Sequence, residues 1–211
     1  MNKDRQNEIR QTAYKEFALN DFKNASLSNI VKNLRLAKGS FYRYFESKID
    51  LYNYLLEYTM QLRMQTLNKL VNEEKSNFFS ILVENFRHKV AFDLQHPLES
   101  IFTYRVLLET NTPELKQIIN NFKQGIYKYT EILLENFVHA GLLRQDIDIK
   151  LSAFLIFQIQ VGLFDYLSTY KGIDFMKNIK EGKTIYTIKE EEVMEIVYKM
   201  VDIIKHGINR K

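Results

Sequence analysis

Apolar residues recur at every third or fourth position along most of the chain, which is the spacing of one face of an α-helix. Near the start, Ile9, Ala13 and Phe17 predict a first helix that ends close to residues 20–21. No stretch shows the sustained alternation of apolar and polar residues that a half-buried strand requires. The chain is therefore expected to be all-α, with about nine helices.

The next two predicted helices are short, and a tight break separates them. Ser26 is placed to cap the second helix by accepting a hydrogen bond from an amide of its first turn. The inner face of this helix is expected to consist of Leu27, Ile30, Val31 and Leu34. A break at residues 35–37 then precedes a third helix over residues 38–45.

Six further helices are predicted from residue 48 onward. Their expected ranges are 51–71, 79–95, 98–109, 113–140, 151–169 and 190–206. Ser47 is placed to cap the first of these, and Thr112 to cap the helix that begins at Pro113. The helix over 151–169 is apolar on every face, but it is too short for a membrane span and contains polar residues, so we interpret it as buried. Residues 170–186 are polar and contain glycine, and we expect a loop there.

Composition narrows the class of protein. The 211 residues, 45% of them hydrophobic, are enough for one or two domains with a sizeable core. No cysteine is present, which excludes disulfides and thiolate metal sites and fits a reducing, cytoplasmic location. The excess positive charge lies in residues 1–50, which hold ten Lys and Arg against six Asp and Glu. Such local charge favours a polyanionic partner, either nucleic acid or a membrane surface.

The third predicted helix lies within residues 36–48, LAKGSFYRYFESK, where basic, aromatic and small side chains are concentrated. A helix, a short turn and a second helix form the helix-turn-helix arrangement, whose second helix enters the major groove of DNA. Phe41 and Phe45 are four residues apart and are expected to be buried together. Tyr42 and Arg43 would then face the DNA, where Arg binds guanine and Tyr contacts phosphate or a thymine methyl group.

This region resembles the DNA-binding domain of the TetR family of bacterial transcriptional regulators. The run KGSFYRYFESK, residues 38–48, is similar to the family's K-G-[ST]-[LF]-Y-x-[HY]-F-x-[ST]-K run, and LSNIVK, residues 27–32, resembles the helix before it. The resemblance covers about residues 5–60. It implies that eight residues contact double-stranded DNA: Ser28, Lys38, Gly39, Ser40, Tyr42, Arg43, Tyr44 and Lys48.

Two positions depart from the family pattern. Arg35 stands in the turn where the family commonly has glycine, and a positive φ there would cost about 1 kcal/mol. Tyr44 stands where histidine is frequent, although a tyrosine can still donate one hydrogen bond to a phosphate. Packing is the alternative role for Tyr44, and a solvated charge is the alternative for Lys48.

The resemblance also divides the chain into a DNA-binding domain, residues 1–47, and a helical ligand-binding and dimerisation domain, residues 48–211. The last helix carries an apolar stripe that we expect at the interface of a homodimer, unless it packs within the monomer. The stripe consists of Val193, Val197, Met200 and Ile204. A two-fold dimer would present two recognition helices to a palindromic operator.

A pocket for a small-molecule effector is expected in the aromatic-rich body. The candidate lining residues are Phe86, Phe102, Arg105, Phe122, Tyr129, Phe154 and Gln158. Core packing is the alternative for each aromatic, and an ion pair with Glu109 is the alternative for Arg105. Gln158 and Gln160 lie in a helix that we expect to be buried, where their amides would need hydrogen-bond partners.

Patterns typical of enzymes are missing from the sequence. The four histidines fit no metal-ligand spacing, and no cofactor is expected. EGKTIY, residues 181–186, ends like a phosphate-binding loop, but Lys177 occupies the position of the first glycine. We therefore expect a TetR-like regulator, a repressor that a ligand releases from DNA. The alternatives are a DNA-binding protein controlled by a protein partner, and an enzyme built on the helical body.

Overall fold

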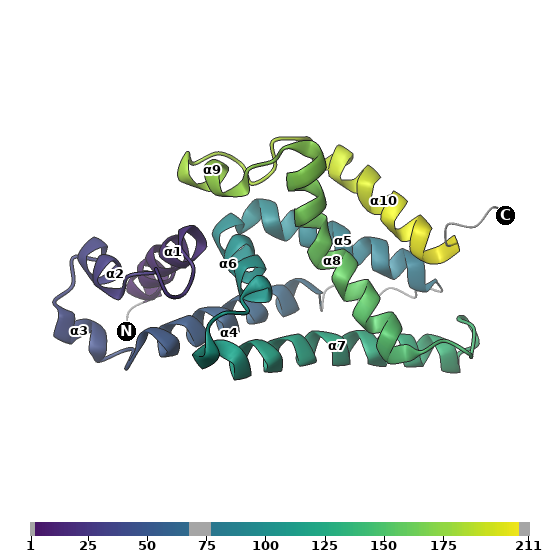
Figure 1. The fold of residues 1–211 in the computed structure, drawn as a ribbon, viewed down its shortest axis with the longest axis horizontal. Coiled ribbons are helices and arrows are strands. Elements are labelled where there is room, and N and C mark those ends of the chain that lie inside the picture. The colour runs from purple at the N-terminus through teal and green to yellow at the C-terminus, as the bar shows by residue number, and fades with distance from the viewer. Residues whose placement is uncertain (1–2, 68–76, 207–211) are drawn as a thin grey trace.

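The computed structural model describes residues 3–67 and 77–206, and its regular structure in these ranges is entirely helical (Figure 1). This confirms the predicted all-α class. The helices are α1 (Lys3–Leu19), α2 (Leu27–Asn33), α3 (Lys38–Tyr42), α4 (Lys48–Leu67), α5 (Phe78–Gln95), α6 (Pro97–Leu108), the 3-10 helix η1 (Pro113–Leu115), α7 (Lys116–His139), α8 (Ile149–Lys171), α9 (Phe175–Lys180) and α10 (Glu190–His206).

Helices α1 to α3 form a small unit at one end of the molecule, which we call the headpiece (Figure 1). Two predicted caps are confirmed, one within the headpiece and one where it meets α4. The Ser26 hydroxyl accepts a hydrogen bond of 3.2 Å from the Asn29 amide at the start of α2. The Ser47 hydroxyl accepts one of 3.1 Å from the Asp50 amide at the start of α4. Helix α4 then runs from the headpiece into the larger helical body.

The apolar core has two parts. One lies in the body, where α5, α8 and α10 meet, and the other joins the headpiece to α4, α6 and the start of α7. In the second part, Phe17 of α1, Leu55 of α4 and Phe102 of α6 belong to one buried cluster. The core is therefore continuous across the predicted domain boundary at residues 47–48, and the headpiece cannot move without repacking the helices behind it.

Helix α9 was not predicted, and the expectation of a loop over residues 170–186 is wrong in this part. The Asp174 carboxylate caps the helix by accepting a hydrogen bond of 2.8 Å from the Lys177 amide. Phe175 and Asn178 are buried against the body. A helix of six residues is too short for apolar periodicity to reveal it, and its stability comes from this tertiary burial.

Two predicted helix ends differ as well, and one of them is the end of α3, which lies at Tyr42 rather than at residue 45. Thr112 does not cap the helix after Pro113, because its hydroxyl is buried without a hydrogen-bond partner and the chain first forms the 3-10 turn η1. Helix α4 is described to Leu67, and its predicted end at Val71 lies outside the described residues.

The turn between α2 and α3 has the left-handed backbone conformation that carries a cost at a residue such as Arg35. Arg35 has φ of 51°, and among the described residues other than glycine it alone has a positive φ. The turn is fixed on both sides, since the Arg35 amide donates to Lys32 and the Leu36 amide donates to Val31. The left-handed conformation is thus imposed by the geometry of the headpiece.

Replacing Arg35 with glycine should stabilise the protein. Relief of the left-handed strain is worth about 1 kcal/mol, which raises the melting temperature by about 2–4 °C in a chain of this size. Arg35→Ala is the matched control, because it removes the side chain and keeps the strain. Thermal unfolding measures both variants, and equal melting temperatures for the two would contradict the prediction.

Candidate DNA-binding surface and ligand pocket

The two faces of the α3 region separate as the sequence predicted. Phe41 and Phe45 are buried, and their ring centroids lie 5.5 Å apart. Burial of a phenylalanine contributes about 1.5–3 kcal/mol, which is how so short a helix stays attached to the headpiece. Tyr42 and Tyr44 keep 43% and 46% of their surface exposed.

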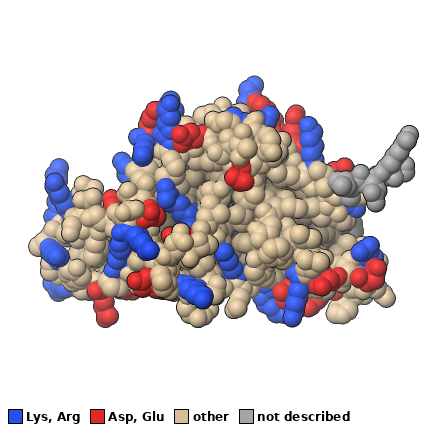
Figure 2. All heavy atoms as spheres, viewed as in Figure 1, with Lys and Arg blue, Asp and Glu red and all other residues tan. Residues whose placement is uncertain are grey.

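Six of the eight predicted DNA-contact residues are exposed at the headpiece, and Ser40 is partly exposed. The exposed ones are Ser28, Lys38, Gly39, Tyr42, Arg43 and Tyr44. Lys and Arg side chains project from this end of the molecule in the space-filling view (Figure 2). A Cβ added to Gly39 would meet nothing within 4 Å, so the space in front of this residue is open to a partner.

Lys48 has a different role from the one implied by the resemblance. Its ammonium group donates hydrogen bonds to the carbonyl oxygens of Phe22 at 2.6 Å and Ala25 at 3.0 Å, with a longer contact of 3.3 Å to Lys23. It also lies 4.6 Å from the centre of the Phe22 ring. All three donors of the ammonium are engaged within the chain, so we assign Lys48 to fastening α4 onto the α1–α2 loop rather than to a phosphate.

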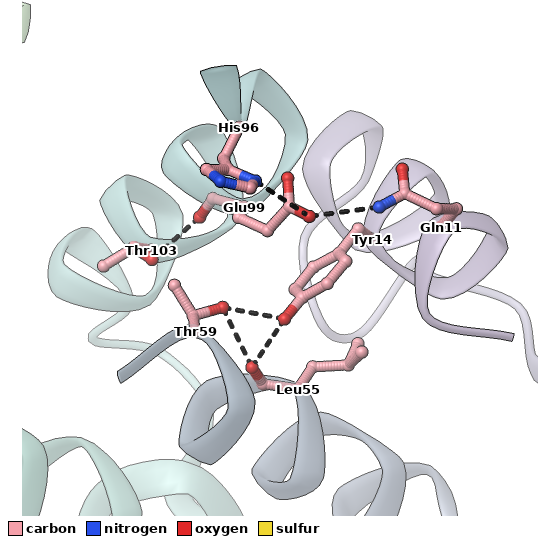
Figure 3. Close-up of polar contacts among 7 residues, drawn as sticks. All are labelled: Gln11, Tyr14, Leu55, Thr59, His96, Glu99 and Thr103. Carbon is pink, nitrogen blue, oxygen red and sulfur yellow. Dashed lines mark hydrogen bonds and ion pairs between the residues drawn. The ribbon is translucent and has the colours of Figure 1, made fainter. Parts of the chain in front are cut away.

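A second polar junction ties α1 to both α4 and α6 (Figure 3). The Tyr14 hydroxyl donates to the Leu55 carbonyl and lies 2.8 Å from the Thr59 hydroxyl, with both contacts buried. The Gln11 side chain donates a hydrogen bond of 3.1 Å to the buried carboxylate of Glu99 on α6. Burial raises the pKa of Tyr14 well above its ordinary value, so the hydroxyl keeps the proton that it donates.

Aromatic rings fill the space beneath this junction. Phe102 has no exposed surface, and its ring centroid lies 4.8 Å from that of Tyr52 and 5.4 Å from that of Tyr14. The prediction that Phe102 lines the ligand pocket is therefore wrong. Its ring instead helps to hold α1 and α4 against α6.

A cavity of about 370 Å³ lies between helices α4 to α8 of the body. This volume is within the range of small-molecule sites, and most of the wall is apolar. Three predicted ligand residues line it: Phe86, Phe122 and Tyr129. Residues that the prediction missed include Met60, Ile126 and Ile156, which reach the cavity from α4, α7 and α8.

The other predicted ligand residues lie elsewhere. Arg105 lines a second cavity of about 640 Å³ beside α1, where its guanidinium contacts the Met176 sulfur at 3.7 Å rather than pairing with Glu109. Phe154 and Gln158 are exposed on the outer side of α8. Helix α8 is apolar on every face, and the residues that the structure describes leave this outer side uncovered.

Charged side chains in the wall of the 370 Å³ cavity were also missed. Arg63 of α4 and Lys89 of α5 line it, and Asp93 lies behind them with no exposed surface. Lys89 donates a hydrogen bond of 2.7 Å to Asp93. The signal was present in the sequence, because Arg63 and Asp93 continue the buried stripes of Leu55 and Thr59 on α4 and of Phe86 and Val90 on α5.

The apolar stripe predicted on α10 packs mostly within the monomer. Val193 and Val197 have no exposed surface and belong to the body core, while Met200 and Ile204 are partly exposed. A side chain without exposed surface cannot contact a second subunit, so the prediction is wrong for the two valines. The apolar side chains left exposed on α8 and α10 are Leu151, Phe154, Leu155, Tyr166, Tyr170, Tyr198 and Ile203.

Helix α8 is long and apolar enough to cross a membrane by length and composition alone. Its inner side contributes Ile156, Phe157 and Phe164 to the packed body, so core packing explains this composition. Within residues 3–67 and 77–206, no group of three or more His, Asp or Glu side chains is arranged to hold a metal ion.

Comparison with known proteins adds independent information. The sequence model of a protein family, described as bacterial regulatory proteins of the tetR family, matches residues 9–55 of this chain. The fatty acid metabolism regulator protein of Bacillus subtilis is 24% identical over 150 residues, which are 71% of this chain and 76% of that protein.

Two solved structures share the whole fold. A TetR family transcriptional regulator from Chloroflexus aurantiacus superimposes with a TM-score of 0.76 at 22% identity, covering 100% of this chain and 96% of the other. The regulator FadR from Bacillus subtilis, solved in complex with stearoyl-CoA, gives a TM-score of 0.73 at 16% identity, covering 97% of this chain and 100% of that one.

Two lysines of the headpiece should respond differently to loss of charge. Lys48→Met should lower the free energy of unfolding by about 1–2 kcal/mol, because the carbonyl oxygens of the α1–α2 loop lose the partly exposed ammonium that donates to them. Lys38→Met changes an exposed side chain and should alter it by less than about 0.5 kcal/mol. Denaturant unfolding compares the two, and an unchanged midpoint for Lys48→Met would show that its contacts do not stabilise the headpiece.

Proposed function

We propose that this chain, which belongs to the TetR family of bacterial regulatory proteins, is a homodimeric repressor released from its operator by a small molecule. The observation that carries this proposal is the exposed surface of α3, where Lys38, Tyr42 and Arg43 project beside an uncovered glycine. A helix N-terminus with exposed basic and aromatic side chains suits the phosphates and base edges of the major groove.

The aromatic side chains give this surface its specificity for DNA. A charge patch alone would bind any polyanion, including a membrane surface. Tyr42 on α3 and Tyr44 just after it are exposed, and Phe41 holds this helix against the headpiece. Such a fixed helix can present the same side chains to successive base pairs, as the helix-turn-helix arrangement requires.

A homodimer explains the exposed apolar side of α8. Leu151, Leu155, Tyr166 and Tyr170 follow one side of the helix, and Gly162 between them has open space where a Cβ would lie. Patches of this kind mark protein interfaces, and regulators of this family act as dimers. A second copy would cover the stripe and place two α3 helices on successive turns of DNA.

The 370 Å³ cavity is the proposed effector site. The Bacillus subtilis relative is named a fatty acid metabolism regulator, and FadR was solved with stearoyl-CoA, which supports a small-molecule effector with an acyl chain. A regulator controlled only by a protein partner would not need so large an apolar cavity between its helices. We therefore favour control by a ligand.

Helix α4 links the cavity to the DNA surface. Met60 and Arg63 line the cavity. On the same helix, Lys48 donates hydrogen bonds to the headpiece and the Leu55 carbonyl accepts one from it. A ligand that shifts the cavity end of α4, near Met60 and Arg63, also displaces the headpiece. This displacement changes the distance between the α3 helices of the two subunits. By linkage, DNA and effector must then weaken each other's binding.

Catalysis is not part of the proposed function, and a location in the bacterial cytoplasm, with the chromosome, follows from it. The family consists of transcriptional regulators. The cavity wall has no acidic side chain among its described residues and no metal-binding group. Binding and release of DNA are sufficient for the proposed role.

DNA binding should depend on Lys38 and Tyr42. Alanine at either position should weaken binding to the DNA upstream of the protein's own gene, and loss of Lys38 should lower the slope of log K against log salt by about 1. Arg144→Ala removes the same charge from an exposed loop and serves as the control. Electrophoretic or fluorescence titration at several salt concentrations measures the effect. Unchanged DNA affinity of the Lys38 and Tyr42 variants would contradict the proposal.

Dimerisation should depend on the exposed side of α8. Leu155→Glu places an unpaired charge at the proposed interface and should raise the dissociation constant of the dimer about 100-fold or more. Leu108→Glu is the control, because Leu108 is similarly exposed but lies at the end of α6. Sedimentation gives the masses, and a Leu155→Glu protein that remains dimeric would place the interface elsewhere.

A further inference from the structure

The proposed effector cavity has more positive than negative charge around it. Arg63 and Lys89 line the cavity, and their one carboxylate neighbour, Asp93, lies behind the wall with no exposed surface. Among the described lining residues no acidic side chain faces the cavity. The cluster therefore holds two cations and one anion at a largely apolar site.

Asp93 does not satisfy both cations. One of its oxygens, Oδ2, accepts hydrogen bonds from Lys89 at 2.7 Å and from the Tyr186 hydroxyl at 2.5 Å. The other, Oδ1, lies 3.7 Å from the Arg63 guanidinium, which is too long for a hydrogen bond. The Arg63 Nε is buried without a hydrogen-bond partner, and the guanidinium lies 4.3 Å from the centre of the Phe92 ring.

Burial makes this arrangement costly in the absence of a partner. It lowers the pKa of both Lys89 and Arg63, while the nearby Asp93 acts in the opposite direction. A buried charge is tolerated when a group of opposite sign and hydrogen bonds compensate for the lost water. Among the described residues, Asp93 is the one carboxylate that pairs with either cation, so one positive charge beside the cavity is not compensated.

A second polar group in the cavity wall lacks a hydrogen-bond partner among the described residues. The Ser100 side chain of α6 is 1% exposed, and its hydroxyl makes no hydrogen bond. It lines the same cavity as Arg63 and Lys89. Buried polar groups without partners are uncommon in folded proteins, and together these groups indicate that a polar part of a ligand belongs here.

We propose that the effector is an amphipathic anion, whose anionic group binds Arg63 and Lys89 while its aliphatic body lies along Phe86, Ile126 and Phe157. This inference rests on the proposed role of the cavity as the effector site. The aliphatic part matches a wall that is mostly apolar, and the anionic part matches the cation surplus. A carboxylate of a fatty acid and the phosphates of an acyl-CoA share this chemistry.

Calorimetric titration of the wild-type protein tests the proposal with three ligands of equal chain length: a straight-chain carboxylate, the corresponding 1-alkanol and the CoA thioester. At least one of the two anions should bind about tenfold or more tightly than the alkanol, since a charge-assisted hydrogen bond is lost in the alkanol. The anion that binds identifies the source of the charge. An alkanol that binds as tightly as both anions would overturn the proposal.

Substitutions at Arg63 locate the anionic group. Arg63→Met keeps the apolar stem and should weaken the anion about tenfold or more, with little effect on the alkanol, whereas Arg63→Lys should retain most of the affinity. Arg144→Met, in an exposed loop, is the matched control. Unchanged anion affinity in folded Arg63→Met would overturn the proposal, and the wild-type ligand comparison decides the matter if this variant does not fold.

Failure of this inference is distinguishable from failure of the proposed function. Binding of upstream DNA by the wild-type protein is measured without any ligand, and its absence would reject the repressor role whatever the titrations show. Intact DNA binding together with equal affinities for anion and alkanol would reject the anionic effector alone. Release of the DNA by the anion, but not by the alkanol, supports both.

Discussion

Helix α4 is fastened to the headpiece at two levels, and the remaining functional features depend on this attachment. Its first residue, Lys48, donates to carbonyl oxygens of the α1–α2 loop, and two turns later the Leu55 carbonyl accepts the Tyr14 hydroxyl of α1. Between these levels Tyr52 packs against Phe17 and Phe102. Polar bonds fix the direction of the helix and the rings exclude water, so α4 and the headpiece form one rigid unit.

This attachment gives a physical route between two distant sites. The opposite end of α4 brings Met60 and Arg63 to the cavity, and an α-helix of 20 residues spans about 30 Å with little internal flexibility. Helix α6 provides a second connection, because Glu99 accepts a hydrogen bond from Gln11 of α1 while Ser100 beside it lines the cavity. A change in the cavity therefore reaches the headpiece through two helices, without any flexible linker.

Buried polar groups divide the molecule by role. At the headpiece junction Tyr14 and Thr59 are paired within the chain, as expected of groups that hold a structure together. In the cavity the Arg63 Nε and the Ser100 hydroxyl are not paired, as expected where another molecule completes the bonding. On the outer side of α8, apolar side chains such as Leu155 and Tyr170 are exposed, and a second subunit would cover them.

Local features of this protein were determined by the sequence. Helical periodicity, the Ser26 and Ser47 caps, and the burial of Phe41 and Phe45 follow from the spacing of neighbouring residues, and the structure confirms them. Tertiary structure alone decided the rest. Phe102 packs at the junction of α1, α4 and α6, and Val193 and Val197 are buried within the monomer. Lys48 donates to carbonyl oxygens of residues more than twenty positions away in the sequence. Which neighbour a given helix face contacts depends on how helices distant in the sequence pack together. Apolar periodicity predicts that a face is buried, but not which element buries it.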